Sequence, residues 1–295
     1  MRIATFYPVS FGRNDGAPLY FTIALRNMGH EVIHFTTEDT KDLETYGKFD
    51  LYLWVDHGED GLPIPYKQIE KLPSPSVYIP CDTHITEKGR DYRFNKALNF
   101  DYVFFNQKRG MDEYLETHPE KKDTTFWLPC AVEPLAYPNT PVAIKKYDVG
   151  FVGFVTFEKR ALALDRMFKE FPNFWFGQKL FEEAAEIYRK SRIIFSSAAV
   201  DDIQMRTFEG TATGSFLLTE WVPHLDELFE DGKHLVTYKT LDEAVEKAKY
   251  YLEHESERET IAKAGMEHTL ANHTYEVRAK KILSIVFPDK LATAK

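Results

Sequence analysis

The feature that most constrains the fold of this chain is the alternation of short apolar runs with helical patterns from one end to the other. In the first half, the runs are short and rich in β-branched and aromatic residues, which is typical of strands. An amphipathic segment between the first two runs, followed by Gly29, indicates a helix with a glycine stop. Such alternation predicts a parallel sheet with helices on both faces. The expected strands are 2–8, 31–36, 51–55, 76–79, 102–105 and 125–128, and the helix is 20–28.

The pattern is interrupted once and then restarts. Residues 133–146 (EPLAYPNTPVAIKK) contain three prolines and no clear periodicity, which is the composition of a linker. After it we expect strands at 149–152, 173–176, 193–197, 215–219 and 235–238. The expected helices are 159–171, 181–190, 204–213, 241–254, 256–271 and 274–287.

The length of 295 residues favours two domains of roughly 100–200 residues each. The fold class predicted is therefore α/β, with two Rossmann-like, doubly wound parallel-sheet domains. The first domain is expected at 1–135, the second at 147–273, and a closing helix with a tail, 274–295, is expected to return to the first. The natural ligand site is a central cleft at the carboxyl ends of both sheets.

Composition narrows the function. There are 37 basic and 46 acidic residues, a net charge of −9, so nucleic acid is disfavoured as a partner. Cys81 and Cys130 each lie beside a proline and are interpreted as small buried residues of a reducing compartment. No apolar run approaches the ~20 residues of a transmembrane span, and the N-terminus is interpreted as a strand rather than a signal peptide. We expect a cytoplasmic protein.

The stretch MRTFEGTATGSFLLTE, residues 205–220, places Arg206 and Glu209 one turn apart at the start of a helix, ahead of several small residues. Free N–H groups and the positive dipole end of such a helix attract phosphate, and Arg206 would add a charge-assisted contact. Glu209, an acceptor when ionised, suits the vicinal hydroxyls of a ribose. The alternative is a surface ion pair at i, i+3.

A second group of cations follows the strand at 149–152. Gly153 opens a loop, and Lys159 and Arg160 begin the next helix, on the same sheet edge as Arg206. Neither the P-loop spacing nor GxGxxG is present. These residues are interpreted as phosphate ligands, and the alternative is a solvated basic helix start.

Polar residues follow four strands of the first half, at Ser10-Phe11-Gly12, Asp56-His57-Gly58, Asp82-Thr83-His84 and Asn106-Gln107. In a parallel sheet all four groups face the same edge. Asp56 or His57 is alternatively a candidate general base for an acceptor hydroxyl, as an inverting mechanism requires. The alternative for the histidines is a hydrogen-bonded loop residue.

The residues from 147 to 278 resemble the C-terminal half of the GT-B glycosyltransferases, in particular the CgeB-type group related to the large retaining family. The stretches that carry the resemblance are YDVGFVG followed by KR, YRKSRIIFSS, MRTFEGTATGSFLLTE, HLDELFEDGKHLVTY and HTYEVR. The resemblance implies a glycosyltransferase that moves a sugar from a nucleotide-diphosphate sugar, UDP- or GDP-linked, to an acceptor that the sequence does not identify. It also implies a retaining outcome, no cofactor and no metal ion.

In the retaining relatives, two acidic residues separated by seven others occupy the donor site. Glu209 matches the second, which binds the ribose, and Asp201 matches the first, which lies near the donor sugar, with aspartate in place of the usual glutamate. Asp202 beside it is a rival, and the alternative for both aspartates is a helix N-cap. His84, after the strand at 76–79, resembles a histidine that contacts the donor sugar.

The resemblance and the residues together give two sets of candidates. The catalytic candidates are His84, Asp82, Asp56, His57 and Asp201. The nucleotide-sugar-binding candidates, with the base placed near Tyr188 or Gln178, are Gly12, Gly153, Lys159, Arg160, Gln178, Tyr188, Asp202, Met205, Arg206, Thr207 and Glu209. The alternatives are a non-catalytic nucleotide-sugar-binding or scaffold protein and, less favoured, a sugar-phosphate epimerase.

Overall fold

The computed structural model describes residues 1–6, 16–35, 43–56, 72–83, 86–142 and 144–289. The chain divides into two compact units. The first comprises Met1–Pro129 and Tyr275–Lys295, and the second comprises Cys130–Thr274. The segment expected as a linker, 133–146, falls within the second unit.

The first unit is built on a six-stranded sheet in the order β2-β1-β3-β4-β5-β6, and every neighbouring pair is parallel. Its strands are β1 (Arg2–Phe6), β2 (Glu31–Phe35), β3 (Leu51–Asp56), β4 (Ser76–Pro80), β5 (Tyr102–Phe105) and β6 (Thr125–Trp127). Its helices are α1 (Ala17–Asn27), α2 (Glu87–Ala97), α3 (Lys108–Thr117) and α9 (Tyr275–Val286), with 3₁₀ turns η1 (Leu43–Tyr46) and η2 (Pro119–Thr124).

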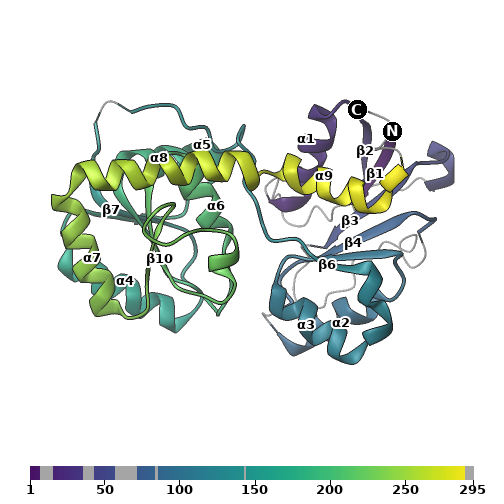
Figure 1. Ribbon diagram of the computed structural model, residues 1–295, viewed down its shortest axis with the longest axis horizontal. Coiled ribbons are helices and arrows are strands. Elements are labelled where there is room, and N and C mark those ends of the chain that lie inside the picture. The colour runs from purple at the N-terminus through teal and green to yellow at the C-terminus, as the bar shows by residue number, and fades with distance from the viewer. Residues whose placement is uncertain (7–15, 36–42, 57–71, 84–85, 143, 290–295) are drawn as a thin grey trace. The chain divides into compact units, whose positions relative to one another are not determined.

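The second unit has a five-stranded parallel sheet in the order β11-β10-β9-β7-β8. Its strands are β7 (Tyr147–Val152), β8 (Phe174–Gly177), β9 (Ser191–Ser196), β10 (Phe216–Glu220) and β11 (Val236–Tyr238). Its helices are α4 (Glu158–Glu170), α5 (Phe181–Lys190), α6 (Met205–Ala212), α7 (Leu241–Glu253) and α8 (Glu255–Asn272), with a 3₁₀ turn η3 (Leu225–Glu227). The α/β class with two doubly wound parallel sheets is therefore confirmed (Figure 1).

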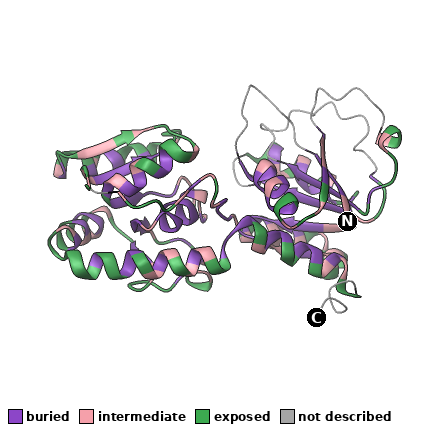
Figure 2. Cartoon of the chain, turned by 90° about the horizontal axis from the view of Figure 1, so that it is seen from above, coloured by how far each residue is buried: buried purple, intermediate pink, exposed green. Residues whose placement is uncertain are grey.

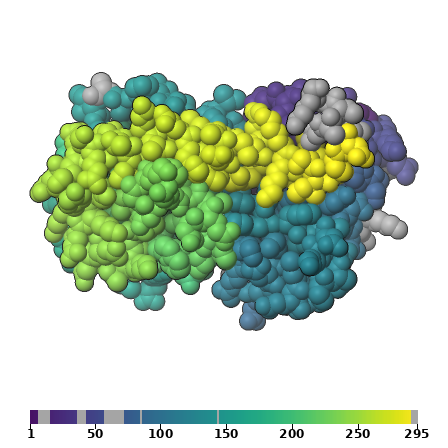
Figure 3. Space-filling view, in the orientation of Figure 1, coloured from purple at the N-terminus to yellow at the C-terminus, as the bar shows by residue number. Residues whose placement is uncertain are grey.

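The burial of the strands explains why they could be predicted from the sequence. All six residues of β3, LYLWVD, are buried, as expected of a parallel strand covered on both faces. In Figure 2 the buried colour runs through the strands, and the helices show buried residues on one side and exposed ones on the other. Helices α7 and α8 form part of the outer surface of the second unit, in the yellow-green to yellow part of Figure 3.

Helix ends follow local chemistry. The hydroxyl of Thr240 accepts the N–H of Glu243, while the carboxylate of Glu243 accepts the N–H of Lys239, so α7 begins with reciprocal capping contacts. Gly29, at φ +82°, ends α1 as the sequence predicted. No helix in the part of the chain that the structure describes is long and apolar enough to cross a membrane.

Helix α9 completes the first unit, although it comes last in the chain. Tyr275 packs its ring against Tyr20 and Phe21 of α1, with centroids 5.2 and 5.0 Å away. The guanidinium of Arg278 donates to the carbonyl of Pro129 at 2.8 Å. These contacts bury the start of α9 against α1.

Candidate functional site

The second sheet has a topological switch point between β7 and β9. Helix α4 follows β7 and packs with α7 on one face, and α6 follows β9 and leads to β10 in the opposite direction along the sheet. In open doubly wound sheets, ligands bind outside the carboxyl ends of the strands at such a point. The chain places a cluster of cations there.

Arg206, from the first turn of α6, is the centre of this cluster. Its Nε donates to the carbonyl of Val152 at 2.7 Å, and its Nη1 donates to Ser196 Oγ at 3.4 Å and Gln204 Oε1 at 3.2 Å. The guanidinium lies 4.1 Å above the centre of the Phe151 ring, and the residue is only 8% exposed. Arg206 thus joins the start of α6 to the ends of β7 and β9. The alternative of a surface ion pair is wrong, because Arg206 is buried.

Gly153 is required by this arrangement. Its φ is +148°, and a Cβ added there would lie 2.2 Å from Nη2 of Arg206. A side chain would therefore meet both backbone strain and the buried guanidinium. The glycine that opens the loop after β7 lets the chain pass close to Arg206.

Arg160 brings a second buried guanidinium to the same place. Its Nε donates to the carbonyl of Ser197 at 3.1 Å, and its Nη1 donates to the carbonyl of Phe154 at 2.8 Å. Burial, and then the neighbouring charge of Arg206, lower the pKa of Arg160 to about 10. Two cations held this close attract an anion.

Lys159 is the exposed cation of the cluster, with about half of its side chain accessible. Its Nζ lies 2.7 Å from Glu220 Oε1 and 3.7 Å from Asp201 Oδ1. The other oxygen of Glu220 accepts the N–H of Ala198 at 3.0 Å and the hydroxyl of Ser197 at 3.3 Å. Sequence reasoning did not select Glu220, although its place at the end of β10, beside β9, was a signal.

Glu209 lies one turn into α6 and is 9% exposed. Tyr188, from α5, lies close enough to Glu209 for that charge to act on its hydroxyl. Burial first, and then the charge of Glu209, raise the pKa of Tyr188 above its ordinary value. Tyr188 is 1% exposed and Glu209 is 9% exposed, so this electrostatic interaction lies in the interior of the unit.

The other predicted residues of this unit lie around the same edge. Asp202 Oδ1 accepts the N–H of Ile203 at 2.8 Å, and Gln178 is exposed just after β8. Met205 and Thr207 are in the first turn of α6, where Thr207 is buried. The alternative that Asp201 or Asp202 caps α6 is wrong, because the N-cap residue is Gln204.

The candidate site residues of the first unit do not form a comparable cluster among the residues that the structure describes. Gly12, His57 and His84 lie outside the described residues. Asp56 ends β3, is 1% exposed, and its Oδ2 accepts the hydroxyl of Tyr78 at 2.5 Å.

Other strand-end residues of this unit lie within the described part of the chain. Asp82, after β4, has a φ of +55°. Thr83 Oγ1 donates to Gln107 Oε1 at 3.3 Å, so the ends of β4 and β5 meet as the sequence predicted. Among the residues described, no three histidine, cysteine or acidic side chains gather as a metal ion would need.

Comparison with known proteins places this geometry in context. A family model described as glycosyl transferase-like matches residues 166–284. A search of curated proteins gave no match. Sucrose-phosphate synthase from Thermosynechococcus elongatus is similar in structure, with a TM-score of 0.68 and 13% identity over 100% of both chains.

Two further solved structures are similar. HepE from Anabaena, in complex with UDP and glucose, has a TM-score of 0.70 and 12% identity over 99% of this chain and 100% of its own. BGT of T4 phage, in complex with UDP-glucose, has a TM-score of 0.62 and 12% identity over 97% and 100%. These structural neighbours are GT-B glycosyltransferases, and the two parallel-sheet units of this chain have the GT-B fold.

Proposed function

We propose that the protein is a glycosyltransferase that takes a sugar from a nucleoside-diphosphate sugar, UDP- or GDP-linked, and transfers it to an acceptor hydroxyl. The observation that carries the proposal is the gathering of Lys159, Arg160 and Arg206 at the switch point of the second sheet, beside the starts of α4 and α6. The family match and the UDP complexes of the structural neighbours support it.

The diphosphate is assigned to the cations and to the helix N-termini. Lys159 is the accessible charge, and its two carboxylate partners would be exchanged for phosphate oxygens. Arg160 and Arg206, held by backbone carbonyls, supply fixed positive charge behind it. Preorganised charge of this kind stabilises a diphosphate as it leaves, with a typical contribution of a few kcal/mol per donor.

Glu209 is assigned to the ribose hydroxyls, and Asp201 to the region of the donor sugar. In the transfer, the bond from the sugar carbon to the phosphate oxygen breaks and the diphosphate departs with the electron pair. The acceptor oxygen forms the new bond to that carbon and loses its proton to a base. The candidates for that base remain Asp56, His57, Asp82 and His84 of the first unit.

Two finer features belong to the same proposal. The resemblance to the CgeB-type retaining group supports retention of configuration, which nuclear magnetic resonance of the first-formed product would test. A cationic diphosphate site supports activity without a divalent ion. We expect turnover to survive EDTA, and a strict requirement for magnesium or manganese would contradict this part.

A second candidate function is binding of a nucleotide sugar without catalysis. It is favoured by Asp201, whose side chain is 74% exposed and lies toward Lys159. Slow hydrolysis of the donor distinguishes the two functions, since a binding protein would retain UDP-glucose or GDP-mannose intact.

The primary test is calorimetric titration of the full chain with UDP, GDP and their sugars. We expect binding that weakens in Lys159→Ala and stays unchanged in Lys169→Ala. Lys169 lies on the same helix, paired with Asp165, and serves as the matched control. Absence of binding to every nucleotide tested would overturn the proposed function.

A further inference from the structure

A polar cavity of about 210 Å³ lies in the first unit, between the first turns of α2 and α3. It opens beside the loop that follows β4, at the carboxyl edge of the first sheet. Its walls are formed by Thr83, Glu87, Arg90, Arg109, Gly110 and Glu113.

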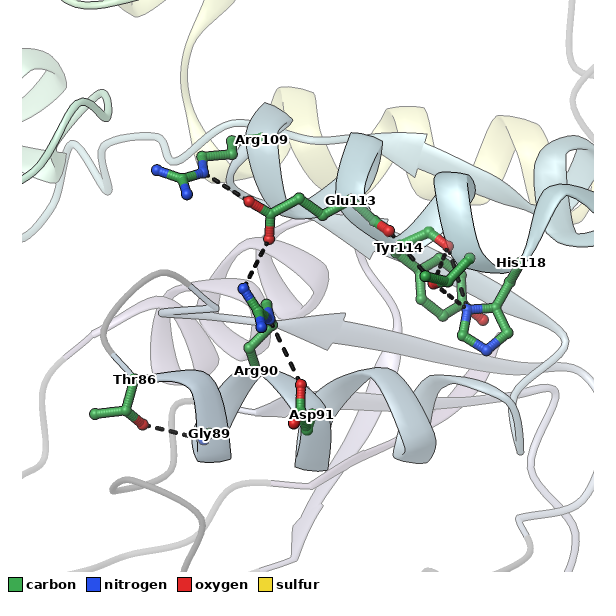
Figure 4. Close-up of polar contacts among 9 residues, drawn as sticks. Thr86, Gly89, Arg90, Asp91, Arg109, Glu113, Tyr114 and His118 are labelled. Atoms are coloured by element: carbon green, nitrogen blue, oxygen red, sulfur yellow. Dashed lines mark hydrogen bonds and ion pairs between the residues drawn. The ribbon is translucent and has the colours of Figure 1, made fainter.

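The carboxylate of Glu113 is the centre of this cavity and is held from two sides. Arg109 Nε lies 2.7 Å from Oε1, and Arg90 Nη1 lies 3.4 Å from Oε2 (Figure 4). Arg90 comes from α2, and Arg109 and Glu113 come from α3. Each carboxylate oxygen of Glu113 therefore faces a different guanidinium, and Arg90 also contacts Asp91 through its Nε at 3.5 Å.

The base of the cavity is rigid. Thr83 is 2% exposed and donates its hydroxyl proton to Gln107. Gly110 rests on Thr83 so closely that an added Cβ would lie 2.2 Å from the threonine Oγ1. The hydroxyl of Thr86 accepts the N–H of Gly89 at 3.0 Å and fixes the start of α2. The guanidinium and carboxylate groups of the cavity are therefore carried by helices whose N-terminal ends are held by these contacts.

The charges of the residues that line the cavity favour one class of ligand. Two arginines and two glutamates line the cavity, so the formal charges of the lining residues cancel. With no net charge among its lining residues, the cavity has no excess positive charge to attract an anion. A hydroxyl both donates and accepts, so it can bond to the carboxylate and a guanidinium while the ion pairs persist.

We propose that this cavity binds a sugar ring through vicinal hydroxyls, with Glu113 accepting and Arg90 and Arg109 donating. The assignment of that sugar as part of the acceptor rests on the proposed glycosyltransferase function, whereas the binding of the sugar does not. The substrate class that follows is a neutral glycan or glycoside, and the ring lies on the acceptor-side unit of the chain.

The test is saturation-transfer NMR of the full chain with methyl α-D-glucoside, methyl β-D-galactoside and methyl α-D-mannoside, in the absence of nucleotide. We expect a signal from at least one of them, weakened tenfold or more in Glu113→Gln. Glu116→Gln, an exposed position on the same helix, is the matched control and should leave the signal unchanged.

Arg109→Gln is the second variant. The Arg109 side chain is 71% exposed, so its removal leaves the fold intact while it releases one side of Glu113. We expect the same loss of sugar signal, with an unchanged melting temperature. Retention of the full signal in both variants would overturn the proposal.

Titration of the same preparations with UDP separates this inference from the function on which it draws. UDP binding without any glycoside signal would overturn the sugar site and leave the proposed function standing. A glycoside signal that depends on Glu113, without binding of any nucleotide, would support the site and overturn the function. Binding of inorganic phosphate that is lost in Arg109→Gln, in place of glycoside binding, would overturn the neutral-ligand assignment.

Discussion

The ammonium of Lys159 lies 2.7 Å from the carboxylate of Glu220, which joins the start of α4 to the end of β10. The same carboxylate accepts the N–H of Ala198, the second residue after β9. The accessible cation of the site therefore pairs with a carboxylate that is itself held by the backbone just after β9.

Lys159→Ala should weaken binding of UDP far more than binding of uridine. A charge-assisted hydrogen bond is typically worth about 1.5–3 kcal/mol, which corresponds to roughly 10- to 100-fold in affinity. Calorimetry with both ligands measures the difference. Equal losses for nucleoside and diphosphate would place Lys159 away from the phosphates.

Glu209→Gln should weaken binding of UDP more than binding of 2′-deoxy-UDP, because only the first ligand offers both ribose hydroxyls to the carboxylate. We expect about tenfold for UDP, the equivalent of one hydrogen bond to a charged group. Glu267→Gln, on the exposed face of α8, is the control. If both nucleotides lose the same affinity, the ribose lies elsewhere.

Arg206→Lys should lower the free energy of unfolding by about 2–4 kcal/mol, since lysine keeps the charge but cannot satisfy Val152, Ser196 and the ring of Phe151 together. Urea unfolding at neutral pH gives the value. Arg192→Lys, at an exposed ion pair with Asp148, should change stability by less than about 1 kcal/mol. Similar losses in the two variants would show that Arg206 is not a structural tie.

The Tyr188→Phe variant should be less stable than wild type at neutral pH, and this difference in the free energy of unfolding should become smaller as the pH rises. Burial and Glu209 raise the pKa of Tyr188 in the folded chain, whereas the unfolded chain titrates near pH 10. The contribution of the protonated hydroxyl is therefore fully present below pH 10 and is lost as pH rises above it. Urea midpoints at pH 8, 9.5 and 11 measure the gap between wild type and variant. A gap that widens with pH would contradict the assigned contact.

The strands could be predicted from the sequence because a parallel sheet buries both faces of each strand. Each strand therefore appears as a continuous apolar run, as in β3. Helix α5 has the predicted bounds, since its apolar stripe is strong. Helices α2 and α3 were not predicted from the sequence. Their sequences, EKGRDYRFNKA and KRGMDEYLET, each contain a glycine and many charges, and little of either is buried.

The cation cluster could be anticipated, because residues that follow parallel strands share one edge of the sheet. The contacts that each cation makes could not be anticipated from the sequence. The burial of Arg206 depends on the carbonyl of Val152, 54 positions earlier in the chain, and the charge of Glu209 acts on the buried Tyr188 of another helix, which no local spacing encodes. Tertiary packing alone determines these contacts.

The last helix has a consequence for synthesis on the ribosome. The second unit, Cys130–Thr274, is complete as soon as residue 274 has emerged, and a bridge between Val132 and Thr274 closes its two ends. The first unit must wait for α9 to cover Tyr20 and Phe21, even though most of it is translated earlier. Domains usually fold in the order in which they are made. Here the unit made later can fold first, while the apolar surface of Tyr20 and Phe21 on α1 stays uncovered until α9 has emerged.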